Sequence, residues 1–128
     1  MLPAFVLEDG IRRENGNSQP LEIPEPGKPL LLTLGITRII EQESLDVAIH
    51  GSPDGETWTE KPILVFPQKF YCGDYARILD LAAHPDVRFL RAQWKMNRWG
   101  RGEHKPEFGF YLFAEAAAVR PLATAAAG

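Results

Sequence analysis

The chain has 128 residues, of which 45 % are hydrophobic and 24 % are charged, and it carries a net charge of −3. This composition is typical of one soluble globular domain with a sizeable core, and it argues against a disordered or membrane-spanning chain. The single cysteine, Cys72, excludes an internal disulfide framework and a zinc site built from several cysteines of one chain.

The first ten residues, MLPAFVLEDG, lack the basic start and the apolar stretch of a signal peptide. No run of about 18 apolar residues follows that could span a membrane. Together with the lone cysteine, these features predict a cytoplasmic protein, either free or part of a larger particle.

Residues 3–7, PAFVL, predict a short edge strand. The polar segment after it contains Asn15-Gly16, a strong tight-turn pair, so we expect a hairpin over residues 11–23 with Leu21 and Ile23 on its inner face. The prolines that follow exclude a helix or a central strand at that point.

Residues 30–40 and 45–50 alternate apolar and polar side chains, which predicts two strands that each bury one face. The polar connection between them could hold a turn of helix. Residues 62–71 predict a strand that bends at Pro67 and lies near a sheet edge. For residues 74–87 two alternatives stay open, a strand or a short helix ended by a proline.

Residues 87–96 alternate again, with Trp94 in phase with Leu90. Residues 108–115, FGFYLFAE, are apolar on both faces, which predicts a central strand or one whose second face is covered by something else. The tail, residues 116–128, is rich in alanine and low in complexity, and we expect a frayed helix start or disorder there.

About six to eight short strands with turn signals every 8 to 12 residues are the pattern of a sandwich or jelly roll. The sequence therefore predicts an all-β fold, an antiparallel jelly-roll-type β-sandwich. We expect residues 1–115 to form one domain with a long, turn-rich N-terminal segment, and residues 116–128 to form an alanine-rich tail.

The stretch IHGSPDGETW, residues 49–58, places a turn between a strand and a tryptophan. Asp54 can accept hydrogen bonds from backbone amides, Gly55 can supply a positive φ, and Trp58 can fold back over the sandwich edge. We interpret Ser52, Asp54, Gly55 and Trp58 as a structural turn.

The order of this turn, a strand ending in LDL, and PDVRFLRAQW before a final hydrophobic strand resembles the discoidin family (coagulation-factor type C domains) and the broader galactose-binding-like jelly rolls. The matching residues are those of the turn and the run Arg88, Phe89, Leu90 and Arg91. The resemblance covers about residues 30–115. It implies a jelly-roll sandwich that binds sugar or lipid through variable loops at one end.

Catalytic chemistry finds little support in the sequence. His50, His84 and His104 do not have the spacing of a local metal motif, and the serines do not sit in a nucleophile elbow. No glycine loop that cradles phosphate opens a helix. We therefore expect no enzyme, no metal and no cofactor, with a small-molecule hydrolase around Cys72 and His84 as a third alternative.

Charge is divided unevenly along the chain. Of 14 basic and 17 acidic residues, residues 88–105 hold six basic and one acidic, which leaves 8 basic and 16 acidic elsewhere. This division favours an anionic partner or head-to-tail pairing of copies, and a basic solvent-facing strand is the plain alternative. Nucleic acid is disfavoured because the acidic remainder would repel a long polyanion.

The end of this basic segment combines aromatic faces with arginine forks, which bind sugars, carboxylates, phosphates or protein partners. The candidate binding residues are Trp94, Arg98, Trp99, Arg101, His104 and Lys105. Trp94 also has the phase of a core residue.

We therefore expect a non-enzymatic protein for binding or assembly, an accessory or structural subunit that docks to protein partners or to copies of itself. The alternative is a discoidin-like carbohydrate-binding module in which Trp99, Arg98 and Trp94 hold the ligand.

Overall fold

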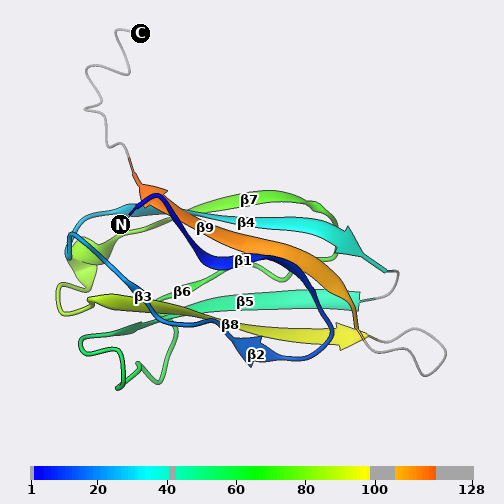
Figure 1. Ribbon diagram of the computed structural model, residues 1–128, viewed down its shortest axis with the longest axis horizontal. Helices are drawn as coiled ribbons and strands as arrows, with labels where there is room; N and C mark the ends of the chain where they lie inside the picture. Colours follow the sequence, from blue (N-terminus) through cyan, green and yellow to red (C-terminus); the bar gives the residue numbers. More distant parts are fainter. Residues whose placement is uncertain (1, 41–42, 99–105, 118–128) are drawn as a thin grey trace, which may run out of the picture.

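Two antiparallel β-sheets face each other in the computed structural model, which describes residues 2–40, 43–98 and 106–117 (Figure 1). One sheet has four strands in the order β1-β9-β4-β7, and the other has the order β2-β8-β5-β6 with β3 also paired to β8. The four-stranded sheet consists of β1 (Ala4–Arg12), β9 (Phe108–Ala116), β4 (Leu30–Ile39) and β7 (Gly73–Leu79). The five-stranded sheet consists of β2 (Gly16–Asn17), β3 (Leu21–Glu22), β8 (Phe89–Arg98), β5 (Glu43–Ser52) and β6 (Leu64–Val65). The prediction of an all-β, antiparallel sandwich is confirmed.

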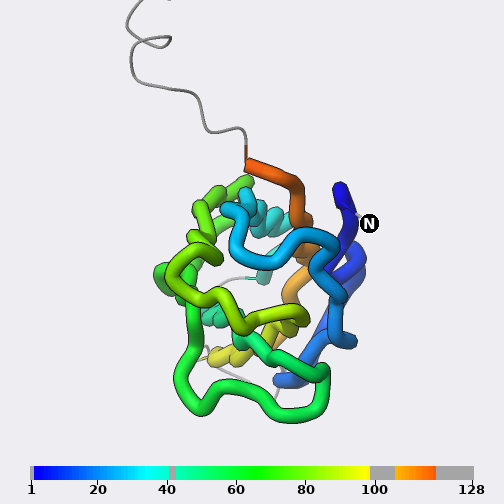
Figure 2. The backbone as a smooth tube through the Cα atoms, turned by 90° about the vertical axis from the view of Figure 1, so that its left-hand side faces the viewer, coloured from blue at the N-terminus to red at the C-terminus, as the bar shows by residue number. Residues whose placement is uncertain are grey.

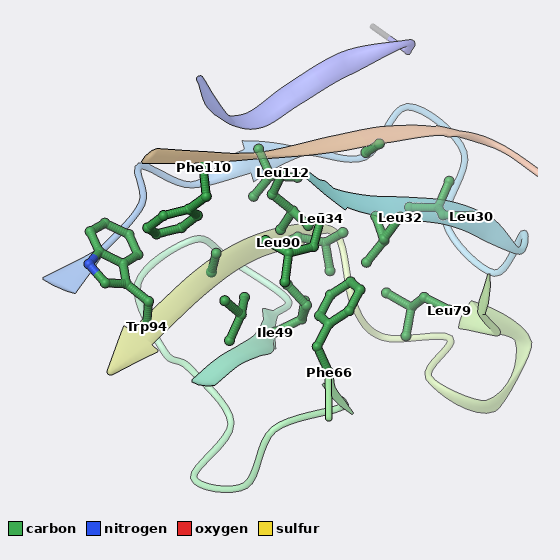
Figure 3. Close-up of a cluster of buried hydrophobic side chains, with 14 of the residues drawn as sticks. Leu30, Leu32, Leu34, Ile49, Phe66, Leu79, Leu90, Trp94, Phe110 and Leu112 are labelled. Carbon is green, nitrogen blue, oxygen red and sulfur yellow. The ribbon is translucent and has the colours of Figure 1, made fainter. Parts of the chain in front are cut away.

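The core lies between the sheets and is built by period-two alternation (Figure 3). On β4, Leu32 and Leu34 are fully buried, and Ile49 of β5 and Leu90 of β8 meet them from the other sheet. Each fully buried side chain of this size contributes about 1.5–3 kcal/mol, so the two facing apolar rows hold the sandwich together. The alternation predicted for the strands at residues 30–40, 45–50 and 87–96 is confirmed.

Strand β9 is the central strand that its two apolar faces predict, because it pairs with β1 on one side and β4 on the other. Phe110 and Leu112 point into the core and are fully buried. Tyr111 and Phe113, at the alternate positions, point to the outside of the sandwich and are partly buried. Strand β1 forms the edge of this sheet, as predicted.

The predicted hairpin over residues 11–23 is wrong. Strand β1 continues to Arg12 in the four-stranded sheet, and the chain then crosses to the other sheet, where β2 and β3 both pair with β8 (Figure 2). Contacts with β8 replace the local turn: Asn15 Oδ1 accepts from Met96 N at 2.7 Å, and Ser18 N donates to Ala92 O at 2.8 Å. These distant partners outweigh the turn preference of Asn15-Gly16.

Two further segments differ in detail from the sequence prediction. In residues 62–71 the strand is reduced to β6, with one additional bridge between Lys69 and Leu45. In residues 74–87 the strand alternative holds for β7, and a single 3-10 turn (Leu81–Ala83) follows, capped by Asp80. In the part of the chain that the structure describes, no helix has the length and apolarity needed to cross a membrane.

Candidate binding surfaces

The outer side of the four-stranded sheet, here called the aromatic face, carries exposed apolar side chains. Phe5, Ile11 and Ile78 are 47 %, 49 % and 55 % exposed. Phe5 and Ile11 lie on the edge strand β1 and Ile78 lies on the opposite edge strand β7, so exposed apolar side chains, which often mark interaction surfaces, occur at both edges of this face. The outward residues of the aromatic face are Phe5, Asp9, Ile11, Leu31, Thr33, Gly35, Thr37, Arg38, Asp74, Ala76, Ile78, Tyr111, Phe113 and Glu115.

Tyr111 lies flat across this face. Its ring rests on Gly35 of the neighbouring strand β4, where a β-carbon would overlap the ring. Its hydroxyl donates to Asp74 Oδ1 of β7 at 3.0 Å. This hydrogen bond stabilises the neutral phenol and is the main reason why the pKa of Tyr111 is raised, with burial as the second cause. The ring is therefore fixed at both ends, with one side against the sheet.

Two phenylalanines and a carboxylate surround the Tyr111 ring. The Phe5 ring stands nearly perpendicular to it, with centroids 5.9 Å apart and an interplanar angle of 84°. Phe5 also packs edge-to-face with Phe113 at 4.9 Å. Asp9 reaches across the sheet and accepts a hydrogen bond from Thr37 Oγ1 at 3.3 Å. Phe5, Asp9, Tyr111 and Phe113 line an open hollow of about 420 Å³, here called the aromatic hollow.

The outer side of the five-stranded sheet is polar. A second hollow, of about 330 Å³ and here called the polar groove, lies over β5 and β8. His50, only 8 % exposed, is part of its lining, with Nδ1 2.8 Å from Thr59 O and Nε2 3.1 Å from Gln93 Oε1. Both ring nitrogens thus have partners, so His50 is suited to holding the loop rather than to proton transfer. The groove is lined by Asp46, Val47, Ala48, His50, Glu60, Pro62, Val65, Gln93 and Lys95.

The turn after β5 has the local structure expected from its sequence. Asp54 Oδ1 accepts from the amides of Glu56 and Thr57 at 2.8 and 2.7 Å, and Gly55 has φ +82°. These backbone hydrogen bonds, Thr57 first, lower the pKa of Asp54 to about 2. The turn brings Trp58 to the outside of β8, where the Arg91 guanidinium lies 4.4 Å from the centre of its ring.

The predicted binding residues divide into those inside and those outside the described chain. Trp94 is 7 % exposed, packs against Phe110, and donates from Nε1 to Glu14 O at 2.8 Å, so it is a core residue. Arg98, partly buried, ends β8 opposite Glu43. Trp99, Arg101, His104 and Lys105 lie outside the described residues.

The residues of the hydrolase alternative are not brought together. Cys72 is exposed and lies directly before β7, whereas His84 caps the 3-10 turn that follows the other end of that strand. A strand of this length spans roughly 20 Å, too far for a nucleophile and its base. Within the described residues, no group of three or more histidine, cysteine or acidic side chains could hold a metal ion.

Sequence reasoning missed the aromatic hollow. Its residues come from β1 and β9, which are the first and the last strand in the sequence. Only the pairing of β1 with β9 in this register places Phe5 beside Phe113. The available signal was the second apolar face of residues 108–115, which we interpreted as a face in need of cover rather than as a site.

Three comparisons with known proteins gave no relative. No protein-family model, no curated protein and no solved structure matches the chain.

Proposed function

We propose that this is a non-enzymatic binding and assembly protein that docks to protein partners or to copies of itself through the aromatic face. The observation that carries the proposal is the exposure of Phe5, Ile11 and Ile78 on one face of one sheet. Leaving such side chains in water forgoes a stabilisation of about 25 cal/mol for each Å² that a partner could bury. A docked protein surface would recover it.

The charges on the two outer faces support pairing between copies. The outward positions of the aromatic face hold the carboxylates of Asp9, Asp74 and Glu115, and the outward Arg38, opposite Gly109, is already paired with Glu107 at 2.8 Å. On the outside of the other sheet, β8 presents Arg91 and Lys95. A head-to-tail contact would bring these unlike charges together, and it would weaken as salt screens them.

Light scattering of the purified protein at micromolar concentration, in low and in high salt, tests the self-assembly. The proposal expects a mass above that of one chain in low salt and a smaller mass in high salt. Ile78→Asp should reduce the mass because it places a charge among the exposed apolar side chains of the aromatic face, on its edge strand β7. A monomer under both conditions would reject assembly of copies.

Tyr71→Asp is the matched control. Tyr71 is a large apolar residue that is 74 % exposed, and it lies in the loop before β7, outside the aromatic face and outside the β8 surface. The proposal expects Tyr71→Asp to disturb association less than Ile78→Asp. Equal effects of the two variants would show that added charge, and not the aromatic face, is what matters.

A carbohydrate-binding module is the second candidate. The polar groove favours it, because the side chains of Asp46, Gln93 and Lys95 converge there beside the stacked pair of Trp58 and Arg91. Such donors and acceptors suit sugar hydroxyls. On a glycan array, binding that Gln93→Ala removes and Ile78→Asp leaves intact would support this function. An array without bound glycans would reject it.

A further inference from the structure

We propose that the aromatic hollow binds a quaternary ammonium group. This goes beyond the proposed function, since it concerns a small cationic ligand group and not the docking of a protein surface. Three aromatic rings and one carboxylate line the hollow. Aromatic rings attract cations through the negative faces of their π-systems, and quaternary ammonium groups are the cations that such cages recognise.

The rings are arranged so that a cation can contact more than one of them. Tyr111 has one side on Gly35 and its hydroxyl bonded to Asp74, which leaves the other side of the ring toward the hollow. Phe5 stands at 84° to this ring and forms a wall beside it. Phe113 packs against Phe5 and continues the wall. A methylated nitrogen seated on Tyr111 would touch Phe5 at the same time.

The charge of the hollow favours a cation. The Asp9 carboxylate is part of its lining, and it accepts a hydrogen bond from Thr37 Oγ1 of β4 at 3.3 Å. The nearby Arg12 guanidinium interacts with the charge of Asp9, but its hydrogen bonds go to backbone carbonyls, among them Phe110 O at 2.8 Å, and it lies over the Phe110 ring. Asp9 therefore remains available as a counter-charge for a ligand.

The lining selects a quaternary over a primary ammonium group. A primary ammonium has three N–H donors and is strongly hydrated, so it needs several acceptors to leave water. The hollow offers one carboxylate, that of Asp9, as an acceptor. The Tyr111 hydroxyl is already hydrogen-bonded to Asp74. A quaternary nitrogen has no donor to satisfy and presents methyl groups to the rings.

The test is a titration of the ¹⁵N-labelled full chain with choline, followed by the amide signals of Phe5, Gly35 and Tyr111. We expect saturable, millimolar binding. The neutral analogue 3,3-dimethylbutan-1-ol, which has the same shape without the charge, should bind about tenfold more weakly or not at all. Equal binding of the two compounds, or no shift with choline, would overturn the proposal.

Variants locate the site. Asp9→Asn removes the counter-charge at nearly constant shape, and Phe5→Leu removes one ring from an exposed position, so both should weaken choline binding about fivefold or more. Ile78→Leu, on the same face but away from the hollow, is the control and should leave binding unchanged. Choline affinity that both hollow variants keep, with the fold intact by its amide spectrum, would also overturn the proposal.

Further arms distinguish the source of the group and separate this proposal from the docking proposal. A trimethyllysine peptide that binds more tightly than choline would identify a methylated protein tail as the source, and equal or weaker binding would identify a free small molecule. Both results support the quaternary ammonium site. The titration is carried out where light scattering shows a single chain, so a failure of assembly does not affect it.

Discussion

The packing of Tyr111 on Gly35 can be tested by a double-mutant cycle. Gly35→Ala places a methyl group where the Tyr111 ring lies, and the ring must lift from the sheet. Overpacking of this kind costs about 1–3 kcal/mol. The lifted ring also loses its hydroxyl hydrogen bond to Asp74, which is worth about 1 kcal/mol or less at an exposed site.

An opposing term comes from the backbone. Alanine is favoured over glycine inside a strand by about 0.5–1 kcal/mol, and φ at Gly35 is not in the positive range that alanine avoids. The net cost of Gly35→Ala should therefore be about 1–2 kcal/mol in the natural sequence. In a Tyr111→Ala background the clash is absent, and the same substitution should be neutral or slightly stabilising.

Urea denaturation of the four proteins gives the coupling free energy, which we expect to be about 2 kcal/mol. The slope of unfolding free energy against urea should stay constant, since the folded state keeps its compactness. A Gly35→Ala cost that is the same with and without the Tyr111 ring would refute the stacking, and with it the floor of the aromatic hollow.

Three further predictions concern buried and exposed polar groups. Glu43 is 2 % exposed and accepts hydrogen bonds from the backbone amides of Glu107 at 2.7 Å and Ile40 at 2.9 Å. Glu43→Ala should therefore leave two donors unsatisfied and lower the free energy of unfolding by about 3 kcal/mol. A loss below about 0.5 kcal/mol in urea denaturation would contradict this. The pKa of Asp54 is lowered from 3.8 to about 2 in the folded chain, so its contribution to stability is present above pH 4 and is lost as the pH falls toward 2. Carboxyl ¹³C shifts against pH measure that pKa directly, and a midpoint near 4 would show that the turn hydrogen bonds are absent. Cys72 is exposed, so it should react with iodoacetamide without denaturant, and a thiol that reacts only in urea would contradict its placement.

The sheets could be predicted because alternation reports burial directly. Leu32 and Leu34 of β4, and Leu90 with Trp94 of β8, fall on one face at a spacing of two, and the structure buries all of them. The phase of Trp94 with Leu90 indicated a core position, although Trp94 was also among the predicted binding residues, and the structure buries it. These positions depend on local spacing alone, and local spacing is visible in one sequence.

The parts that failed depend on contacts between distant segments. The Asn15-Gly16 pair has strong turn chemistry, yet its neighbourhood is held by Trp94 and Met96, about 80 residues further along the chain. The sequence context of Glu43 predicts a polar connection. In the structure Glu43 is buried, and its carboxylate accepts hydrogen bonds from two backbone amides. A sequence pattern cannot supply such partners, because they follow from which strands pair and in which register.

The aromatic hollow was out of reach for the same reason. Phe5 and Tyr111 lie near opposite ends of the amino-acid sequence, and each of them alone has the pattern of an ordinary strand residue. Their apposition requires β1 to pair with β9, and the flat position of the Tyr111 ring requires glycine at position 35. Aromatic residues at outward positions of a central strand were the visible signal, and a search for such positions would have identified Tyr111 and Phe113.

The central claim is that the outside of the four-stranded sheet is the surface through which this protein binds. Amide spectra recorded over a series of protein concentrations, from a single chain to the associated form, test it residue by residue. The account predicts that the signals that shift or broaden cluster on β1, β4, β7 and β9, at Phe5, Ile78 and their neighbours, together with the complementary surface around Arg91 and Lys95 of β8. Changes confined to β5 and β8, or scattered without regard to face, would contradict it.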